Sequence, residues 1–144
     1  MRIAVISDTH DRVPAKLPER VREADEIWHL GDVCAPDVLR EFAQLGPPIQ
    51  VVRGNCDTHD AWPLVLELER EGVKFLLTHI PPQNAPHGCA VVLHGHTHIA
   101  RDEMRAGLRW LNPGAVTRPG DGSASWAWLT VERGKLTHWE LMRI

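Results

Sequence analysis

Short apolar segments at residues 2–6, 26–30 and 49–53 divide the first third of the chain. Apolar runs of this length, each bounded by small polar residues, are typical of buried strands. Between them, residues 15–24 predict a weak helix, and an apolar face predicts a second helix over about 37–45. Strands that alternate with helices in this way indicate a parallel sheet with helical crossovers.

The second half of the chain has a different pattern, in which tight turns separate strand-like segments. Glycines at positions 72, 107 and 134 lie in these turns, as in β-hairpins. Three hairpins are expected, and their paired strands lie at residues 63–69 and 73–79, at 99–105 and 108–112, and at 124–132 and 135–143. A single short strand is expected at residues 90–94. The sequence therefore predicts an α/β sandwich, with the strand order left open.

Length and composition limit the function classes that remain. A chain of 144 residues is expected to form one domain over residues 1–144. The formal net charge of −3 argues against a large nucleic-acid footprint, and no apolar run approaches the ~18 residues of a membrane span. The three cysteines form no CxxC motif, which argues against a disulfide framework and fits a reducing cytoplasm.

Five of the predicted strands end at side chains that can bind a metal. In α/β sheets, sites gather beyond the carboxyl ends of strands. The donors are oxygen and imidazole atoms, which suit Mn, Fe, Zn, Ni or Co better than a thiolate zinc site or an all-oxygen calcium site. Any one of them alone is an ordinary turn or core residue. The full set contains Asp8, His10, Asp32, Asn55, His79, His96 and His98.

The number of donors indicates more than one ion. Seven donors are too many for one ion and fit two ions if one carboxylate bridges them. A bridging carboxylate allows metals roughly 3.5–4 Å apart, as in two-metal sites of phosphoryl transfer.

The order of these motifs resembles that of the calcineurin-like metallophosphoesterases. The matching residues are Asp8-Thr9-His10, Gly31-Asp32, Gly54-Asn55-Cys56-Asp57, His79 and Gly95-His96-Thr97-His98. Together with Asn112-Pro113-Gly114, they resemble the small single-domain phosphodiesterase branch, which shares its fold with a retromer subunit. The resemblance implies two facing mixed β-sheets flanked by helices, with reduced helices and a reduced lid.

The resemblance also implies which residues hold two divalent metal ions. One ion would be held by Asp8, His10, Asp32 and His98, and the other by Asp32, Asn55, His79 and His96. Mn²⁺ is the expected metal, with Zn²⁺, Fe²⁺, Ni²⁺ or Co²⁺ as alternatives.

The implied reaction is hydrolysis of a small phosphodiester or other phosphoester by a metal-bridging hydroxide. The residues expected to contribute to catalysis are Asp32, Asn55, Cys56, Asp57 and His96, with Asp57 orienting its loop. An alternative function is a catalytically weak metal-binding scaffold for protein–protein interaction. A third is a single-metal protein with a regulatory role.

The chain departs from the family pattern in three ways. Cys56 stands where many members have a His that protonates the leaving group, and a thiol is a weaker acid. His59 lies three residues further on and is an alternative acid or a solvated loop residue. Ile80 replaces the usual Gly, and residues 80–89 have no room for the common helix. We therefore expect an open site that favours phosphodiesters with good leaving groups.

Several other residues allow two interpretations each. Arg53 and Arg118 can contact a phosphate or lie on the surface, and Cys34 is expected to pack beside the site. Trp126 and Trp128 share one face of a strand, and they are expected to be buried; an exposed pair would indicate a homodimer or partner surface. His29 and His94 are expected to be core residues.

Overall fold

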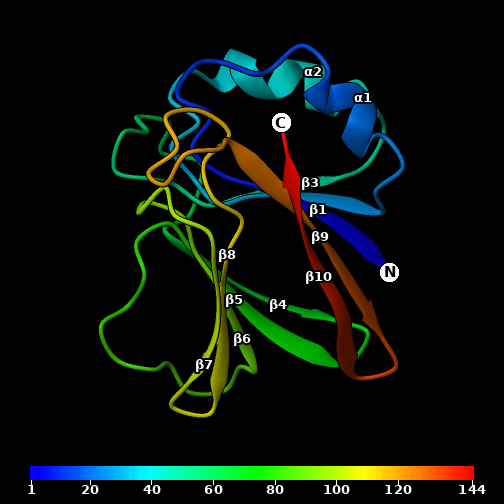
Figure 1. Cartoon of the computed structure of the whole chain (residues 1–144), viewed down its shortest axis with the longest axis vertical. Helices are drawn as coiled ribbons and strands as arrows, with labels where there is room; N and C mark the ends of the chain where they lie inside the picture. The colour runs from blue at the N-terminus through cyan, green and yellow to red at the C-terminus, as the bar shows by residue number, and fades with distance from the viewer.

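The computed structural model describes residues 1–144 and contains two five-stranded sheets that pack face to face (Figure 1). The first sheet has the order β10-β9-β1-β2-β3, in which β1, β2 and β3 are parallel and β9 is antiparallel to β1. Its strands are β1 (Arg2–Ile6), β2 (Glu26–His29), β3 (Ile49–Val51), β9 (Ser125–Glu132) and β10 (Lys135–Arg143). The predicted parallel sheet is confirmed, but a hairpin from the end of the chain completes it.

The second sheet has the order β4-β5-β6-β8-β7. Its three central strands are parallel, and both edge strands are antiparallel to their neighbours. The strands are β4 (Val65–Arg70), β5 (Val73–Thr78), β6 (Val91–Leu93), β7 (Arg101–Arg105) and β8 (Leu108–Asn112). Both sheets are therefore mixed, and the expected sandwich of two facing sheets is confirmed.

The helices are short and lie over the outer face of the first sheet (Figure 1). The helix predicted at 15–24 is present only as α1 (Leu17–Val21), which carries a proline in its first turn. The helix predicted at 37–45 consists of a 3-10 turn over Pro36–Leu39 followed by α2 (Arg40–Ala43). None of the helices is long and apolar enough to cross a membrane.

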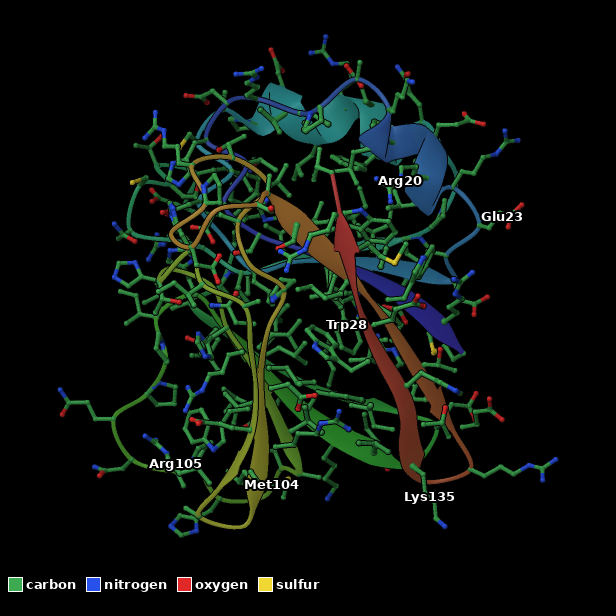
Figure 2. The ribbon with its side chains drawn as sticks, in the orientation of Figure 1. Arg20, Glu23, Trp28, Met104, Arg105 and Lys135 are labelled. Atoms are coloured by element: carbon green, nitrogen blue, oxygen red, sulfur yellow. The ribbon has the colours of Figure 1, made fainter.

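The main core lies between the two sheets. Trp28 of β2 is fully buried there and meets Phe75 of β5 edge to face, with ring centroids 5.1 Å apart (Figure 2). A second core lies under the helices, where Trp126 and Trp128 are buried with ring centroids 5.0 Å apart. Burial of these two rings is as expected, so they present no surface for a dimer.

The outer face of the second sheet carries no helix. Residues 80–90 form bends and irregular backbone there. Ala85 and Cys89 from this segment pack against a small buried cluster of Leu76, Val92, Leu108 and Trp110. The segment is thus a covering loop, in agreement with the reduced helix content expected from its length.

The parallel strands of both sheets bring their carboxyl ends to the same region of the sandwich. The segments that follow β1, β2 and β3 meet there with those that follow β5 and β6 (Figure 1). Direct hydrogen bonds join these segments: the Asp8 N–H donates to the Gly31 carbonyl at 3.0 Å, and the Gly95 N–H donates to the His79 carbonyl at 3.0 Å. Side chains at these positions therefore converge.

Candidate metal centre

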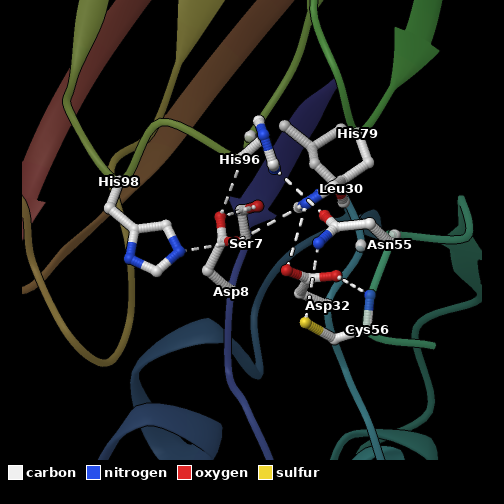
Figure 3. A network of polar contacts seen from close by, with 12 residues as sticks. Ser7, Asp8, Leu30, Asp32, Asn55, Cys56, His79, His96 and His98 are labelled. Carbon is white, nitrogen blue, oxygen red and sulfur yellow. Dashed lines mark hydrogen bonds and ion pairs between the residues drawn. The ribbon is translucent and has the colours of Figure 1, made fainter.

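All seven predicted donor residues lie together at this end of the sandwich. Each follows a strand of the parallel part of a sheet, and Figure 3 shows most of them facing a common space. Six of them form two groups, and within each group the ligand atoms lie within 4.8 Å of one another. One group contains Asp8, His10, Asp32 and His98, and the other contains Asp32, His79 and His96. Asp32 belongs to both groups.

Asn55, the seventh predicted donor, contacts His96 of the second group. The Asn55 Oδ1 atom lies 3.0 Å from Nδ1 of His96, on the side of the site where His79 also lies (Figure 3). Asn55 therefore lies beside the second group of ligand atoms.

Two buried atoms of this cluster have no hydrogen-bond partner. They are Oδ1 of Asp8 and Nε2 of His79, both on residues with almost no exposed surface. Although Oδ2 of Asp32 lies 3.2 Å from His79 Nε2, the contact lacks the alignment of a hydrogen bond. A buried polar atom without a partner is costly in free energy, which favours a ligand at this position.

Backbone carbonyls hold two of the imidazole rings in one orientation. The Nδ1 atom of His79 donates to the Leu30 carbonyl at 2.7 Å, and that of His98 donates to the Arg118 carbonyl at 2.7 Å. Each ring therefore has a proton on Nδ1, and in the neutral form of the ring the lone pair is on Nε2. This is the arrangement that metal-binding histidines have in proteins.

The lone pairs then face other acceptors. Nε2 of His98 lies 3.1 Å from Oδ1 of Asp8 and 3.4 Å from Nε2 of His10. A lone pair on Nε2 and a carboxylate oxygen at this separation repel one another unless a proton or a cation lies between them. A set of carboxylate and imidazole donors with this convergence fits divalent transition metals.

The remaining carboxylate oxygens receive hydrogen bonds. Ser7 Oγ donates to Oδ2 of Asp8 at 2.6 Å, and the Cys56 N–H donates to Oδ1 of Asp32 at 2.9 Å. Each carboxylate thus has one oxygen held by the protein and the other directed at the imidazoles. Such outer partners fix the orientation of metal-binding carboxylates.

Asp57 lies behind the cluster and acts on the backbone. Its carboxylate accepts three N–H bonds, from Asp32 at 2.9 Å, Cys34 at 2.6 Å and Gly54 at 2.7 Å. The carboxylate therefore ties the segment after β2 to the segment after β3. This arrangement agrees with the expectation that Asp57 orients its loop.

Two glycines allow the segments to approach one another closely. A Cβ atom on Gly54 would overlap the backbone nitrogen and the carboxylate of Asp32, and one on Gly95 would overlap Oγ of Ser7. Any side chain at either position would displace an atom of the site.

Most of the donor residues have a left-handed backbone conformation, which the sequence analysis did not predict. Five of the six residues in the two groups have positive φ, between 46° and 71°: Asp8, His10, Asp32, His96 and His98. This conformation is uncommon for non-glycine residues and costs about 1–3 kcal/mol at each position. Such strain is concentrated at functional sites, where the surrounding structure maintains it.

The charges of the cluster shift the pKa values of its members. Burial opposes ionisation of Asp32, but the contact with His79 and the Cys56 N–H bring its pKa below the ordinary value. Burial also opposes the charged form of His79, yet the nearby carboxylates of Asp32 and Asp8 raise its pKa overall. The carboxylate of Asp32 is therefore ionised at neutral pH, as a cation-binding residue must be.

Both cysteines near the cluster remain protonated at neutral pH. Burial, assisted by the charge of Asp11, raises the pKa of Cys34 to about 11, and its Sγ lies 3.7 Å from Nδ1 of His10. Desolvation and the charge of Asp32 also raise the pKa of Cys56, whose side chain is exposed at the rim of the site. Cys34 thus packs beside the cluster, as expected.

Other residues singled out from the sequence lie at the edge of the site or away from it. His59 packs against Trp62, with ring centroids 4.8 Å apart, and Arg53 forms an ion pair with Asp60 at 3.2 Å. Arg118 is exposed, and it is the carbonyl of this residue that contacts His98. His29 and His94 are buried core residues, as expected.

Comparison with known proteins identifies the family. The sequence model of the calcineurin-like phosphoesterase superfamily domain matches residues 1–134. The chain belongs to this superfamily. Phosphoesterases of the superfamily are metal-dependent, and the Asp and His groups described above form the candidate metal site of this member. The resemblance seen in the ordered sequence motifs is thereby confirmed.

Individual relatives agree with this assignment. A probable metallophosphoesterase of Methanothermobacter thermautotrophicus is 33% identical over 138 residues, which cover 83% of this chain and 79% of the relative. Phosphodiesterase YfcE of Escherichia coli is 31% identical over 158 residues, which cover 85% of this chain and 83% of the relative. The relatives of this phosphoesterase thus include small metallophosphoesterases and phosphodiesterases.

Solved structures share the fold. An archaeal phosphodiesterase superposes with a TM-score of 0.86 at 24% identity, over 100% of both chains. Vps29 from Entamoeba histolytica, complexed with Zn²⁺, superposes with a TM-score of 0.80 at 19% identity, over 100% of this chain and 98% of the other. At these identities the similarity establishes the sandwich fold alone.

Proposed function

We propose that this phosphoesterase is a two-metal phosphodiesterase. The observation that carries the proposal is the sharing of Asp32 between two groups of ligand atoms. A carboxylate in this position can bridge two ions, the arrangement used by enzymes that hydrolyse phosphoesters. The buried atoms without partners, Asp8 Oδ1 and His79 Nε2, support it because they lie in different groups.

The residues that would hold the ions follow from the two groups. Asp8, His10, Asp32 and His98 would hold one ion, and Asp32, Asn55, His79 and His96 would hold the other. Mn²⁺ is the proposed metal, and Zn²⁺, Fe²⁺, Ni²⁺ or Co²⁺ would fit the same donors. When bound, two divalent cations supply Lewis acidity that activates water and attracts the phosphate anion.

The protein itself preorganises the site. The carbonyls of Leu30 and Arg118 keep the Nε2 lone pairs of His79 and His98 directed inward before any ligand binds. The N–H bonds to Asp57 keep the segments that carry Asp32 and Asn55 at a fixed separation. Preorganised groups of this kind stabilise developing charge without reorganisation during the reaction.

Cys56 determines the class of substrate in this proposal. Its thiol is exposed beside Asn55, with Sγ 3.7 Å from the Asn55 amide nitrogen. A thiol is a poor proton donor compared with the His that many relatives have at this position. Phosphodiesters whose leaving groups need no proton are therefore the proposed substrates, in preference to alkyl phosphomonoesters.

The alternative function is a metal-binding scaffold for another protein. The similarity to Vps29 concerns the fold, and fold alone does not decide function. A scaffold that only binds another protein does not require two groups of metal ligands, and this chain contains two such groups. Catalysis is therefore the function that the site supports best.

The direct test is hydrolysis of bis-p-nitrophenyl phosphate. Metal-stripped protein is assayed with and without Mn²⁺, next to the variants His96→Ala and His138→Ala. His138 is an exposed residue of β10 and serves as a matched control. The proposal predicts turnover that requires metal, is lost in His96→Ala and is kept in His138→Ala. Absence of turnover in protein that has bound two metals per chain would refute it and favour the scaffold.

A further inference from the structure

A cavity of about 370 Å³ opens next to the candidate metal site. Two residues of the site, Asn55 and His79, form part of its wall. The apolar part of the wall consists of Leu64, Val65 and Ile80. The volume lies within the range of ~300–1,000 Å³ that small-molecule sites have.

The apolar wall is held in place by the main chain. Val65 is the first residue of β4 and pairs with Thr78 of β5, so Leu64 and Ile80 flank the same end of this hairpin. The Arg53 N–H donates to the Pro63 carbonyl at 2.8 Å, which ties the start of β4 to the end of β3. The wall is therefore fixed relative to Asn55, two residues after Arg53.

The three apolar side chains are unusually exposed. Leu64 is 58%, Val65 48% and Ile80 52% exposed, although each is a large hydrophobic residue. The other exposed large hydrophobic residues do not line this cavity. Exposed apolar surface that gathers beside a polar site is characteristic of ligand-binding sites.

The polar groups of the cavity are already engaged in contacts within the protein. Thr78 Oγ1 donates to the Ile80 carbonyl at 3.2 Å, and the Asn55 amide oxygen contacts His96. Because these side chains are engaged, few polar groups of the wall remain to hydrogen-bond with a nucleobase. Arg53 contributes a guanidinium whose ion-pair partner, Asp60, is almost fully exposed. A planar guanidinium stacks well on aromatic rings.

We propose that this cavity binds an apolar aromatic ester group of the substrate, so that aryl phosphodiesters are the preferred substrate class. The inference rests on the proposed function, because it places the phosphate at the metal site and the ring in the cavity. Asn55 and His79 connect the two places, and Figure 3 shows both side chains on the same side of the centre. Burying the ring against Leu64 and Ile80 removes apolar surface from water, which strengthens binding.

The test compares two phosphonates that differ only in their apolar group. Phenylphosphonate and methylphosphonate are titrated into Mn²⁺-loaded protein by calorimetry. We expect phenylphosphonate to bind about ten-fold more tightly, as burial of a ring predicts. In Leu64→Ser and in Ile80→Ser the difference should fall to about three-fold or less, because each change removes part of the wall. Methylphosphonate affinity should stay the same in both variants.

Met104→Ser is the matched control. Met104 is 69% exposed and lies at the β7 end of the second sheet, away from the centre (Figure 2). This variant should keep the wild-type preference for phenylphosphonate. Equal affinity for both phosphonates in the wild type, or an unchanged preference in both wall variants, would overturn the inference.

A parallel assay separates this inference from the proposed function. Hydrolysis of methyl p-nitrophenyl phosphate is measured with the same protein samples. Turnover without a preference for phenylphosphonate would refute the aromatic site and leave the phosphodiesterase standing. A preference for phenylphosphonate without turnover of any diester would refute the phosphodiesterase and leave the aromatic site standing.

Discussion

The Nε2 atom of His98 lies 3.1 Å from Oδ1 of Asp8, while its Nδ1 atom donates to the carbonyl of Arg118. The ring therefore directs its Nε2 atom at a buried carboxylate oxygen that has no other partner. In the neutral form of the ring the two acceptors repel one another, and a cation between them removes this repulsion. The same contact thus links stability to metal binding.

Replacing Asp8 with asparagine should therefore stabilise the metal-free protein. The amide nitrogen that this change introduces can donate to Nε2 of His98, whereas the amide oxygen can keep the hydrogen bond from Ser7. We expect a gain of about 1 kcal/mol, which raises the melting temperature by roughly 2–4 °C. Added Mn²⁺ should raise the melting temperature of the wild type by more than that of Asp8→Asn, which keeps only the second group of ligand atoms intact.

The control for this change is Asp121→Asn. Asp121 is exposed and lies outside both groups of ligand atoms. The variant should melt like the wild type and respond to Mn²⁺ in the same way. A metal-free Asp8→Asn protein that melts below the wild type would show that Asp8 and His98 do not repel one another.

Asp57→Ala should weaken both the fold and the metal site. The change leaves the N–H groups of Asp32, Cys34 and Gly54 without their acceptor. We expect a loss of about 2–4 kcal/mol in the free energy of unfolding by urea. Metal affinity measured by calorimetry should fall by roughly 10–100-fold, as for other residues that orient ligands.

Asp60→Ala serves as the comparison because it lies in the same loop. Its carboxylate is exposed and pairs only with Arg53, so its removal should cost less than about 1 kcal/mol. Equal effects of the two changes on metal affinity would mean that Asp57 does not hold the site together.

Cys56→His should broaden the substrate range toward alkyl phosphomonoesters. A His at this position provides a proton donor for a poor leaving group. We expect monoester hydrolysis to rise at least about ten-fold, with little change for bis-p-nitrophenyl phosphate. Cys56→Ser, which also lacks a good acid, should behave like the wild type. A Cys56→Ser variant that loses diester turnover would assign the thiol another role.

His29 should make the protein sensitive to acid. Burial, with a smaller contribution from His79, lowers the pKa of His29 to about 3 in the folded state, whereas in the unfolded chain it is about 6.5. The unfolded state therefore binds the proton first. Stability from this residue is complete above pH 6.5 and is lost as the pH falls toward 3, by about 1.4 kcal/mol per pH unit.

Urea unfolding of metal-free protein between about pH 7 and pH 5 measures this dependence. In His29→Asn the amide oxygen can still accept the Gly31 N–H that Nδ1 of His29 accepts at 3.1 Å. The variant should be less stable at neutral pH but lose less stability than the wild type at lower pH. If the free energy of unfolding depends on pH in the same way in both proteins, His29 binds its proton as readily in the folded state as in the unfolded state.

Much of the fold could be predicted because its signals are local. Apolar runs marked the strands to within a few residues, and glycine turns marked the hairpins, as at Gly72 and Gly134. The sheet order could not be predicted in the same way. Pairing of β1 with β9 joins Arg2 to Thr130, and no local pattern encodes such a contact. The predicted helix at 15–24 was too long, because charged residues with scattered apolar positions do not show where tertiary contacts end a helix.

For the candidate site, the donor residues could be predicted from the sequence, whereas the groups that orient them could not. The donor side chains could be named from the sequence because only a few residue types bind metals. The groups that orient them could not, since Leu30 and Arg118 act through backbone carbonyls that every residue has. The left-handed backbone of Asp8 and Asp32 was also missed, although Asp is among the residue types enriched in this conformation.

The measurement that tests the two-metal account most directly is turnover as a function of bound metal. Metal-stripped protein is titrated with Mn²⁺, and bound ions per chain and hydrolysis of bis-p-nitrophenyl phosphate are recorded on the same samples. Because Asp32 belongs to both groups of ligand atoms, we predict that turnover appears as the second ion binds and that Asp32→Ala binds no pair of ions. Full turnover with one ion per chain, or none with two, would contradict the account.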